Sequence, residues 1–97
     1  MIAAVRPLTE IRSMCPSDLT VVTEIESDSY NFPWSYGVFR DCLLAGYQSL
    51  VLVISGTVTG YGIMSVAASE AHLLNLCVHP DAQQLGYGRR LLNALLV

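Results

Sequence analysis

The residues best suited to chemistry form a run of glycines and polar side chains late in the sequence. Residues 83–90 (QQLGYGRR) follow an apolar segment expected to be a strand and open a segment expected to be a helix. A turn of this kind directs several free backbone N–H groups at one point, which suits a phosphate group. Gly86 and Gly88 permit backbone angles and close approach that a Cβ would block, and Arg89 and Arg90 add positive charge. The run therefore predicts a pyrophosphate site.

A simpler interpretation of the same run stays open. Two glycines can merely make a tight strand-to-helix turn with solvated arginines, because short glycine motifs are common by chance. The run is not a Walker loop, since no Gly-Lys-Ser/Thr follows it. It also lacks the third glycine and the βαβ context of a Rossmann fingerprint.

The first half of the chain supplies two predicted helices. Residues 11–14 read as a short strand, and residues 15–18 open a helix whose apolar side should meet a sheet. The next helix begins after a Ser35 cap, runs to about Leu44 and ends before Gly46. The positions expected on the apolar sides are Leu19, Val22 and Ile25 for the first helix, and Val38, Phe39, Cys42 and Leu43 for the second.

The second half predicts antiparallel strands. Residues 50–54 and 57–67 form a hairpin around a turn at Ser55 and Gly56. Gly60 and Gly62 share one face of the second strand, where a helix is a more probable neighbour than a ligand. A turn at 69–70 leads to a strand over 72–78, which is nearly continuous in apolar residues and is predicted to be central and buried. A last helix starts around 86–88.

Composition limits the function classes. The chain has 97 residues, which is one domain at most, and 53% of them are hydrophobic against 13% charged. No apolar run approaches the ~20 residues of a membrane span, so a cytoplasmic protein is expected. The net charge of −3 argues against a nucleic-acid surface. Three widely spaced cysteines indicate neither a disulfide framework nor a zinc site.

The last predicted helix carries helix-forming residues to Val97 without a stop signal. Ending on Leu-Leu-Val would leave helical carbonyls uncapped and apolar side chains unpaired. We therefore expect residues 1–97 to be a single unit that is the N-terminal part of a longer domain.

A family resemblance adds to this interpretation. Gln83-x-x-Gly86-x-Gly88 resembles the acetyl-CoA motif of the GNAT superfamily of N-acetyltransferases, and residues 75–81 (NLCVHPD) resemble the strand that approaches it. Upstream, residues 11–14, 32–35 and 60–63 are similar to the RimI-like branch, whose members acetylate the N-terminal alanine of a small-subunit ribosomal protein.

The resemblance implies an α/β (α+β) fold with a mainly antiparallel sheet flanked by helices, lacking its C-terminal strands. It implies acetyl-CoA as co-substrate, no metal, and a protein N-terminus as acceptor. The implied cofactor-binding residues are Leu76, Cys77, Val78, Gln83, Gln84, Leu85, Gly86, Tyr87, Gly88 and Arg89. Phe32, Pro33 and Trp34 match a loop near the acceptor peptide, although a cluster covering the core explains them as readily.

Acetyl transfer to an amine needs a base and an acid, and the resemblance places both beyond Val97. We therefore expect this chain to be impaired by itself. His72 is a weak substitute base, since a satisfied strand histidine is the more common situation. Cys77 is interpreted as inert packing. Glu24, Glu26 and Glu70 are interpreted as solvated carboxylates.

Two other function classes remain open. One is a GNAT enzyme with another amine acceptor, which a preference for alanine-first peptides would exclude. The other is a non-catalytic module that binds acetyl-CoA or a protein partner. In either case the apolar strand at 73–78 is expected to leave an unpaired edge that favours self-association.

Overall fold

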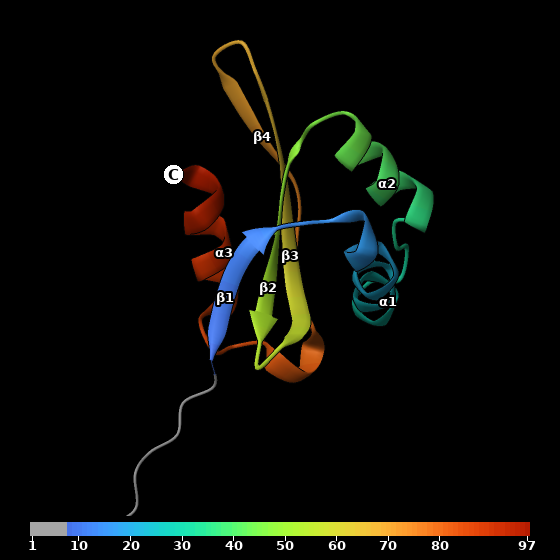
Figure 1. The fold of residues 1–97 in the computed structure, drawn as a ribbon, viewed down its shortest axis with the longest axis vertical. Coiled ribbons are helices and arrows are strands. Elements are labelled where there is room, and N and C mark those ends of the chain that lie inside the picture. Colours follow the sequence, from blue (N-terminus) through green and yellow to red (C-terminus); the bar gives the residue numbers. More distant parts are fainter. Residues whose placement is uncertain (1–7) are drawn as a thin grey trace, which may run out of the picture.

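Four antiparallel strands form the centre of the computed structural model, which describes residues 8–97 (Figure 1). The strands β1 (Thr9–Ser13), β2 (Gln48–Ile54), β3 (Thr57–Ala67) and β4 (Glu70–Val78) are neighbours in that order. The helices are α1 (Leu19–Ser29), α2 (Tyr36–Leu44) and α3 (Tyr87–Leu96), with 3-10 turns η1 (Pro16–Asp18) and η2 (Pro80–Ala82). None of the helices in residues 8–97 is long and apolar enough to cross a membrane. The predicted α+β class with a mainly antiparallel sheet is confirmed.

Helices cover both faces of the sheet, with α1 and α2 on one side and α3 on the other (Figure 1). Strand β2 shows why, because its side chains alternate between the two faces. Val51 and Val53 pack in the core under α1 and α2, whereas Leu52 packs with Leu91 of α3. Both faces of the sheet are therefore buried in its central part.

The predicted helices and the hairpin are confirmed. The expected apolar residues of α1 are buried, and Ser35 Oγ accepts a hydrogen bond from the Val38 N–H at the start of α2. Gly46 follows α2 with a positive φ of 76°. Ser55 and Gly56 turn the chain between β2 and β3. Val38 differs from the prediction, because its side chain faces outward while Phe39 and Cys42 fill the core.

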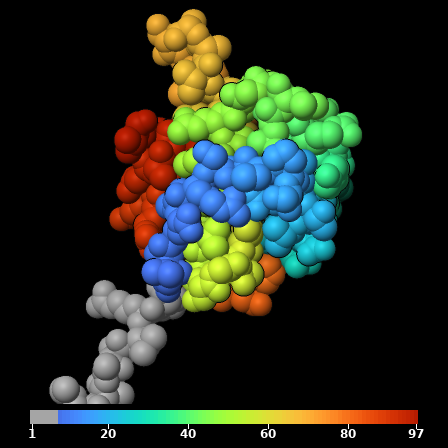
Figure 2. All heavy atoms as spheres, in the orientation of Figure 1, coloured from blue at the N-terminus to red at the C-terminus, as the bar shows by residue number. Residues whose placement is uncertain are grey.

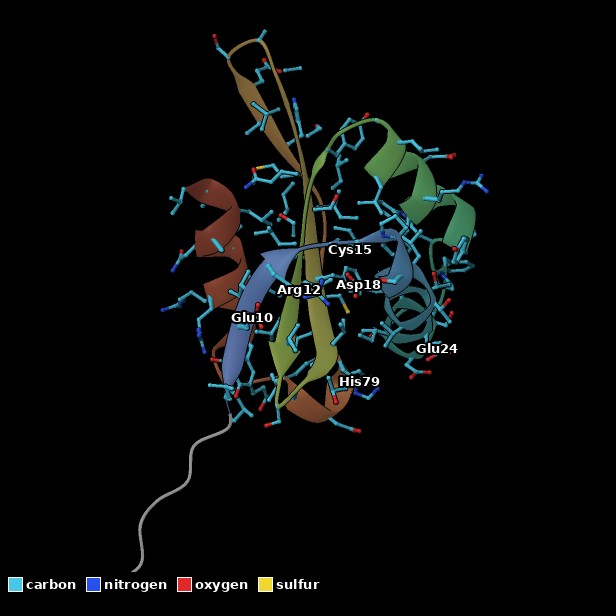
Figure 3. All side chains as sticks on the ribbon, in the orientation of Figure 1. Glu10, Arg12, Cys15, Asp18, Glu24 and His79 are labelled. Carbon is cyan, nitrogen blue, oxygen red and sulfur yellow. The ribbon has the colours of Figure 1, made fainter. Side chains whose placement is uncertain are left out.

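An ion pair joins the start of α1 to β1 (Figure 3). Asp18 is buried and accepts hydrogen bonds from Arg12 Nη1 at 2.8 Å and Nη2 at 2.9 Å. It also accepts one from the Cys15 N–H at 2.8 Å. The Arg12 hydrogen bond, opposed by burial, lowers the pKa of the Asp18 carboxyl. This carboxylate fixes where the chain leaves the sheet to begin α1.

The two glycines of β3 face α3, so the expectation of a packed helix there is confirmed. A Cβ at Gly62 would lie 2.7 Å from Leu95 Cδ1. At Gly60 it would lie 2.9 Å from the Cys77 carbonyl oxygen and 3.2 Å from Leu91 Cδ1. The missing side chains allow α3 to lie close to the sheet, which brings the start of this helix to the end of β4.

Strand β4 departs from its prediction as a central, buried strand. It is the edge of the four strands described, and only Cys77 and Val78 are buried. The first half is exposed because it continues with the end of β3 into a hairpin that projects beyond the helices (Figure 2). A bulge separates the two halves: Ile63 pairs with Asn75 and Met64 with Leu73, which leaves Leu74 without a partner.

Candidate functional site

The loop before α3 presents a row of free backbone donors. Gln84 has a φ of 67° and Gly86 a φ of 82°, and the first helical bond runs from Arg90 N to Gly86 O. Within the part of the chain that the structure describes, no N–H of residues 84–89 donates a hydrogen bond. A non-glycine residue at positive φ is uncommon, and such alternating backbone makes an anion-binding concavity. The loop has the geometry expected of a phosphate site.

Two side chains hold this loop at the end of β4. His79 Nδ1 accepts a hydrogen bond from the Asp81 N–H at 3.1 Å, which caps η2. Gln83 Nε2 donates to the Val78 carbonyl at 2.9 Å. The side chain of Gln83, which the motif placed in the cofactor site, is thus engaged with the strand.

The end of β4 also offers free backbone donors. In an antiparallel strand the N–H and C=O of one residue point to the same side. The Leu76 carbonyl accepts from the Tyr30 hydroxyl at 3.1 Å and the Val78 carbonyl from Gln83, so both point away from β3. The N–H groups of Leu76 and Val78 therefore also point outward, and no acceptor for them is found within residues 8–97.

Residues of both sets, Gln84 and Gly88 of the loop and Leu76 and Val78 of β4, line one cavity of about 230 Å³. We call it the donor cavity, and it is lined by Ser29, Tyr30, Leu76, Cys77, Val78, Ala82, Gln83, Gln84 and Gly88. A Cβ on Gly88 would meet no atom within 4 Å, so the space in front of this residue is open. The pKa of the Tyr30 hydroxyl is raised, mainly by burial and to a smaller extent by the nearby Cys77 thiol. The hydroxyl therefore stays protonated and donates its hydrogen bond. The cavity suits an extended ligand with carbonyl groups at the strand and phosphates at the loop.

The two arginines of the motif have different surroundings. Arg89 is exposed. Arg90 Nη2 donates to Thr9 Oγ1 at 3.0 Å, and its guanidinium lies 5.9 Å from the centre of the Tyr87 ring. The side chain of Arg90 is therefore held against β1.

A second hollow of about 330 Å³ shares the lining residue Tyr30 with the donor cavity. We call it the aromatic hollow, and it is lined by Glu26, Tyr30, Asn31, Phe32, Trp34, Leu74 and Asn75. Phe32 is 94% exposed, whereas Trp34 packs on Phe39 with ring centres 5.3 Å apart. Of the predicted substrate residues, Phe32 and Trp34 line this hollow and Pro33 does not. Tyr30 lines both spaces.

Glu26 is the residue that sequence reasoning missed, since its interpretation as a solvated carboxylate is wrong. It is 2% exposed and accepts hydrogen bonds from the Trp34 N–H at 2.9 Å and Asn75 Nδ2 at 2.8 Å. The Tyr61 hydroxyl donates a third hydrogen bond to Glu26. The pKa of this hydroxyl is raised, mainly by burial and to a smaller extent by the hydrogen bond itself. The signal that could have found it is helical spacing, because Glu26 follows Val22 by four residues and Leu19 by seven and so lies on the apolar side of α1.

The remaining candidates lie apart from these two spaces or contribute no polar contact. The His72 side chain is 62% exposed near the tip of the β3–β4 hairpin and lies 3.0 Å from Glu70 Oε2. It lines neither the donor cavity nor the aromatic hollow. Cys77 is a buried free thiol that lines the donor cavity. Within residues 8–97 no group of His, Cys, Asp and Glu side chains is arranged to hold a metal ion.

An antiparallel sheet with helices on both faces, and with a donor-rich loop where its edge strand meets a helix, is the arrangement of an acyl-CoA N-acyltransferase domain. The model of the acetyltransferase (GNAT) family matches residues 13–97, and the chain belongs to this family. The chain is 34% identical to the [ribosomal protein bS18]-alanine N-acetyltransferase of Escherichia coli K12 over 92% of its own length.

Solved structures of acetyltransferases are similar to this fold. The crystal structure of the ribosomal-protein-S18-alanine N-acetyltransferase from Escherichia coli covers 92% of this chain with a TM-score of 0.86 and 34% identity. The structure of yncA, a putative acetyltransferase from Salmonella typhimurium with acetyl-CoA, covers 91% with a TM-score of 0.71 and 26% identity. The chain spans 57% and 61% of these two structures, and 60% of the curated Escherichia coli relative.

Proposed function

We propose that the donor cavity binds acetyl-CoA. The observation that carries this proposal is that one cavity is lined both by Leu76 and Val78, whose N–H groups point outward from β4, and by Gln84 and Gly88 of the loop with free N–H groups. The loop donors suit the pyrophosphate, and the strand donors suit carbonyl oxygens of the acyl arm. Gly88 leaves the room that the ligand needs.

We also propose, for the protein as a whole, acetyl transfer to the N-terminal alanine of a ribosomal protein in the cytoplasm. The name of the Escherichia coli relative, at 34% identity, supports this acceptor. Because the chain spans 60% of that relative, the proposal concerns the activity of the whole protein.

Bound acetyl-CoA would supply a thioester whose acyl carbon a neutral amine attacks. A C–N bond would form, the C–S bond would break, and the proton lost by the amine would end on the departing thiolate sulfur of CoA. The outward N–H of Leu76 is placed to donate to the carbonyl oxygen, where negative charge develops. Tyr30 lines both spaces and would contact both substrates. The Gln83 hydrogen bond to Val78 keeps the loop and the strand at a fixed separation.

Calorimetric titration with acetyl-CoA tests the proposal. Gly88→Trp should abolish saturable binding, because Gly88 lines the cavity, a Cβ at this position meets no atom within 4 Å, and the indole would occupy the space that the ligand needs. Asn93→Trp, at an exposed position of the same helix, is the matched control and should bind as the wild type does. Binding that survives Gly88→Trp, or no binding by the wild type, would contradict the proposed site.

A peptide assay with the whole protein then separates the function classes. Faster turnover of an alanine-first peptide than of a lysine side chain or small amine supports the proposed acceptor. Binding of acetyl-CoA without any turnover would instead select the non-catalytic module.

A further inference from the structure

Glu26 is a buried carboxylate whose hydrogen-bond partners are all neutral. The Trp34 N–H, the Asn75 amide and the Tyr61 hydroxyl all donate to it, so it acts purely as an acceptor, as an ionised carboxylate does. Within the described residues no arginine, lysine or histidine forms an ion pair with it. Buried charges in proteins are normally paired, so this one lacks a counter-charge.

The aromatic hollow is where a counter-charge can approach Glu26. Glu26 is part of its lining, although the residue is 2% exposed. A carboxylate has about four acceptor positions, and the three observed hydrogen bonds leave one of them available. A cation in the hollow would therefore find a carboxylate that is shielded from water and has one acceptor position available.

The walls of the hollow also suit a cation. Tyr30, Phe32 and Trp34 contribute three aromatic side chains to the lining of the hollow that Glu26 also lines. Aromatic faces attract ammonium groups, by about 0.5–1 kcal/mol at exposed sites and more where the group is desolvated. An aliphatic or anionic ligand would leave the charge of Glu26 uncompensated, whereas a primary ammonium supplies both the charge and the donors that the site lacks.

We propose that Glu26 recognises the protonated terminal amine of the acceptor in this hollow, as a binding residue that distinguishes substrate from product. The proposal rests on the proposed function and names the group that binds beside Tyr30. Acetylation removes the positive charge, so the product loses its attraction to Glu26. The same contact that selects a free amine therefore favours release of the acetylated chain.

The test compares two peptides with the same chain. An alanine-first peptide and its N-acetylated form are titrated into the protein at about pH 6.5, where a terminal amine with a pKa near 8 is protonated. The wild type should prefer the free amine by about tenfold, and Glu26→Gln should reduce the preference to less than about twofold. Glu24→Gln removes an exposed carboxylate from the same helix and should leave the preference unchanged.

A measurement on the wild type keeps the proposal testable if Glu26→Gln does not fold. The NMR signals of the Trp34 N–H and the Asn75 side-chain amide, both hydrogen-bonded to Glu26, should shift with the free-amine peptide and not with the acetylated one. Equal affinity of the wild type for both peptides, or signals that do not respond to the amine, would overturn the proposal.

The acetyl-CoA titration of the same sample separates the two proposals. A protein that binds acetyl-CoA but does not distinguish the peptides refutes the role of Glu26 alone. A protein that distinguishes the peptides through Glu26 but does not bind acetyl-CoA upholds the amine site and refutes the proposed cofactor.

Discussion

Gln83 Nε2 donates a hydrogen bond to the Val78 carbonyl at 2.9 Å, and this contact ties the first residue of the loop to the last residue of β4. Neither residue needs to touch a ligand with its side chain for the contact to matter. It fixes the distance between the two groups of free N–H donors that line the donor cavity.

Replacing Gln83 with alanine should loosen the loop. The loss of one hydrogen bond is expected to lower the free energy of unfolding by about 1 kcal/mol. Acetyl-CoA affinity should fall several-fold, because the loop donors are no longer held relative to Leu76 and Val78. Calorimetry and urea unfolding measure the two effects. An unchanged affinity would show that the contact does not position the loop, and Asn93→Ala on the exposed side of α3 is the control.

The two glycines of the motif should respond to alanine with opposite signs. Gly86→Ala places a Cβ at a φ of 82° and should lower the free energy of unfolding by about 1–2 kcal/mol. Gly88 is a residue of α3, and a Cβ at this position would meet no atom within 4 Å. Gly88→Ala should therefore raise the free energy of unfolding by roughly 0.5–1 kcal/mol. Thermal unfolding of both variants checks this, and equal changes of the same sign would contradict it.

The Arg12–Asp18 pair should contribute stability that depends on pH. The Arg12 hydrogen bond lowers the pKa of Asp18 in the folded protein below its unfolded value of about 3.9. The contribution is therefore complete above that unfolded value and is lost as the pH falls through the folded pKa. Asp18→Asn should lower the free energy of unfolding by about 1–2 kcal/mol at neutral pH, and by less in acid. Urea unfolding at several pH values measures the difference, and a constant difference would exclude this linkage.

Self-association through β4 stays a prediction. Leu73 is 46% exposed and Leu74 38% exposed on the edge strand of the described sheet. Unpaired edge strands with apolar side chains template pairing with other chains. Sedimentation velocity should show association that rises with concentration and weakens in Leu73→Lys, because a charge on an edge opposes pairing. A monomer at all concentrations would refute it.

Local signals predicted most of the elements because their causes lie within a few residues. The Ser35 cap, the turn at Ser55 and Gly56, and the spacing of Leu19, Val22 and Ile25 each act over one or two turns of chain. The glycine motif belongs to the same class, since the backbone angle of Gly86 is a property of the loop itself. These features needed no knowledge of the packing.

The burial of strand β4 could not be predicted from its local sequence. An apolar run indicates burial by something, but the pattern does not say whether the cover is another strand, a helix or solvent beyond a bulge. In the structure the bulge at Leu74 divides the run, and only its last residues lie under helices.

The sequence by itself determined the family motif, the order of helices and strands and the position of the phosphate-type loop, because each depends on neighbouring residues. Only the tertiary structure decided that Glu26 is buried. Helical spacing places Glu26 on the same side of α1 as Leu19 and Val22, and Glu24 on another side, but it does not say which groups would satisfy a carboxylate there. The partners Tyr61 and Asn75 are 35 and 49 residues away along the chain. A carboxylate leaves water when distant donors converge on it, and that convergence exists only after β3, β4 and α1 have packed together.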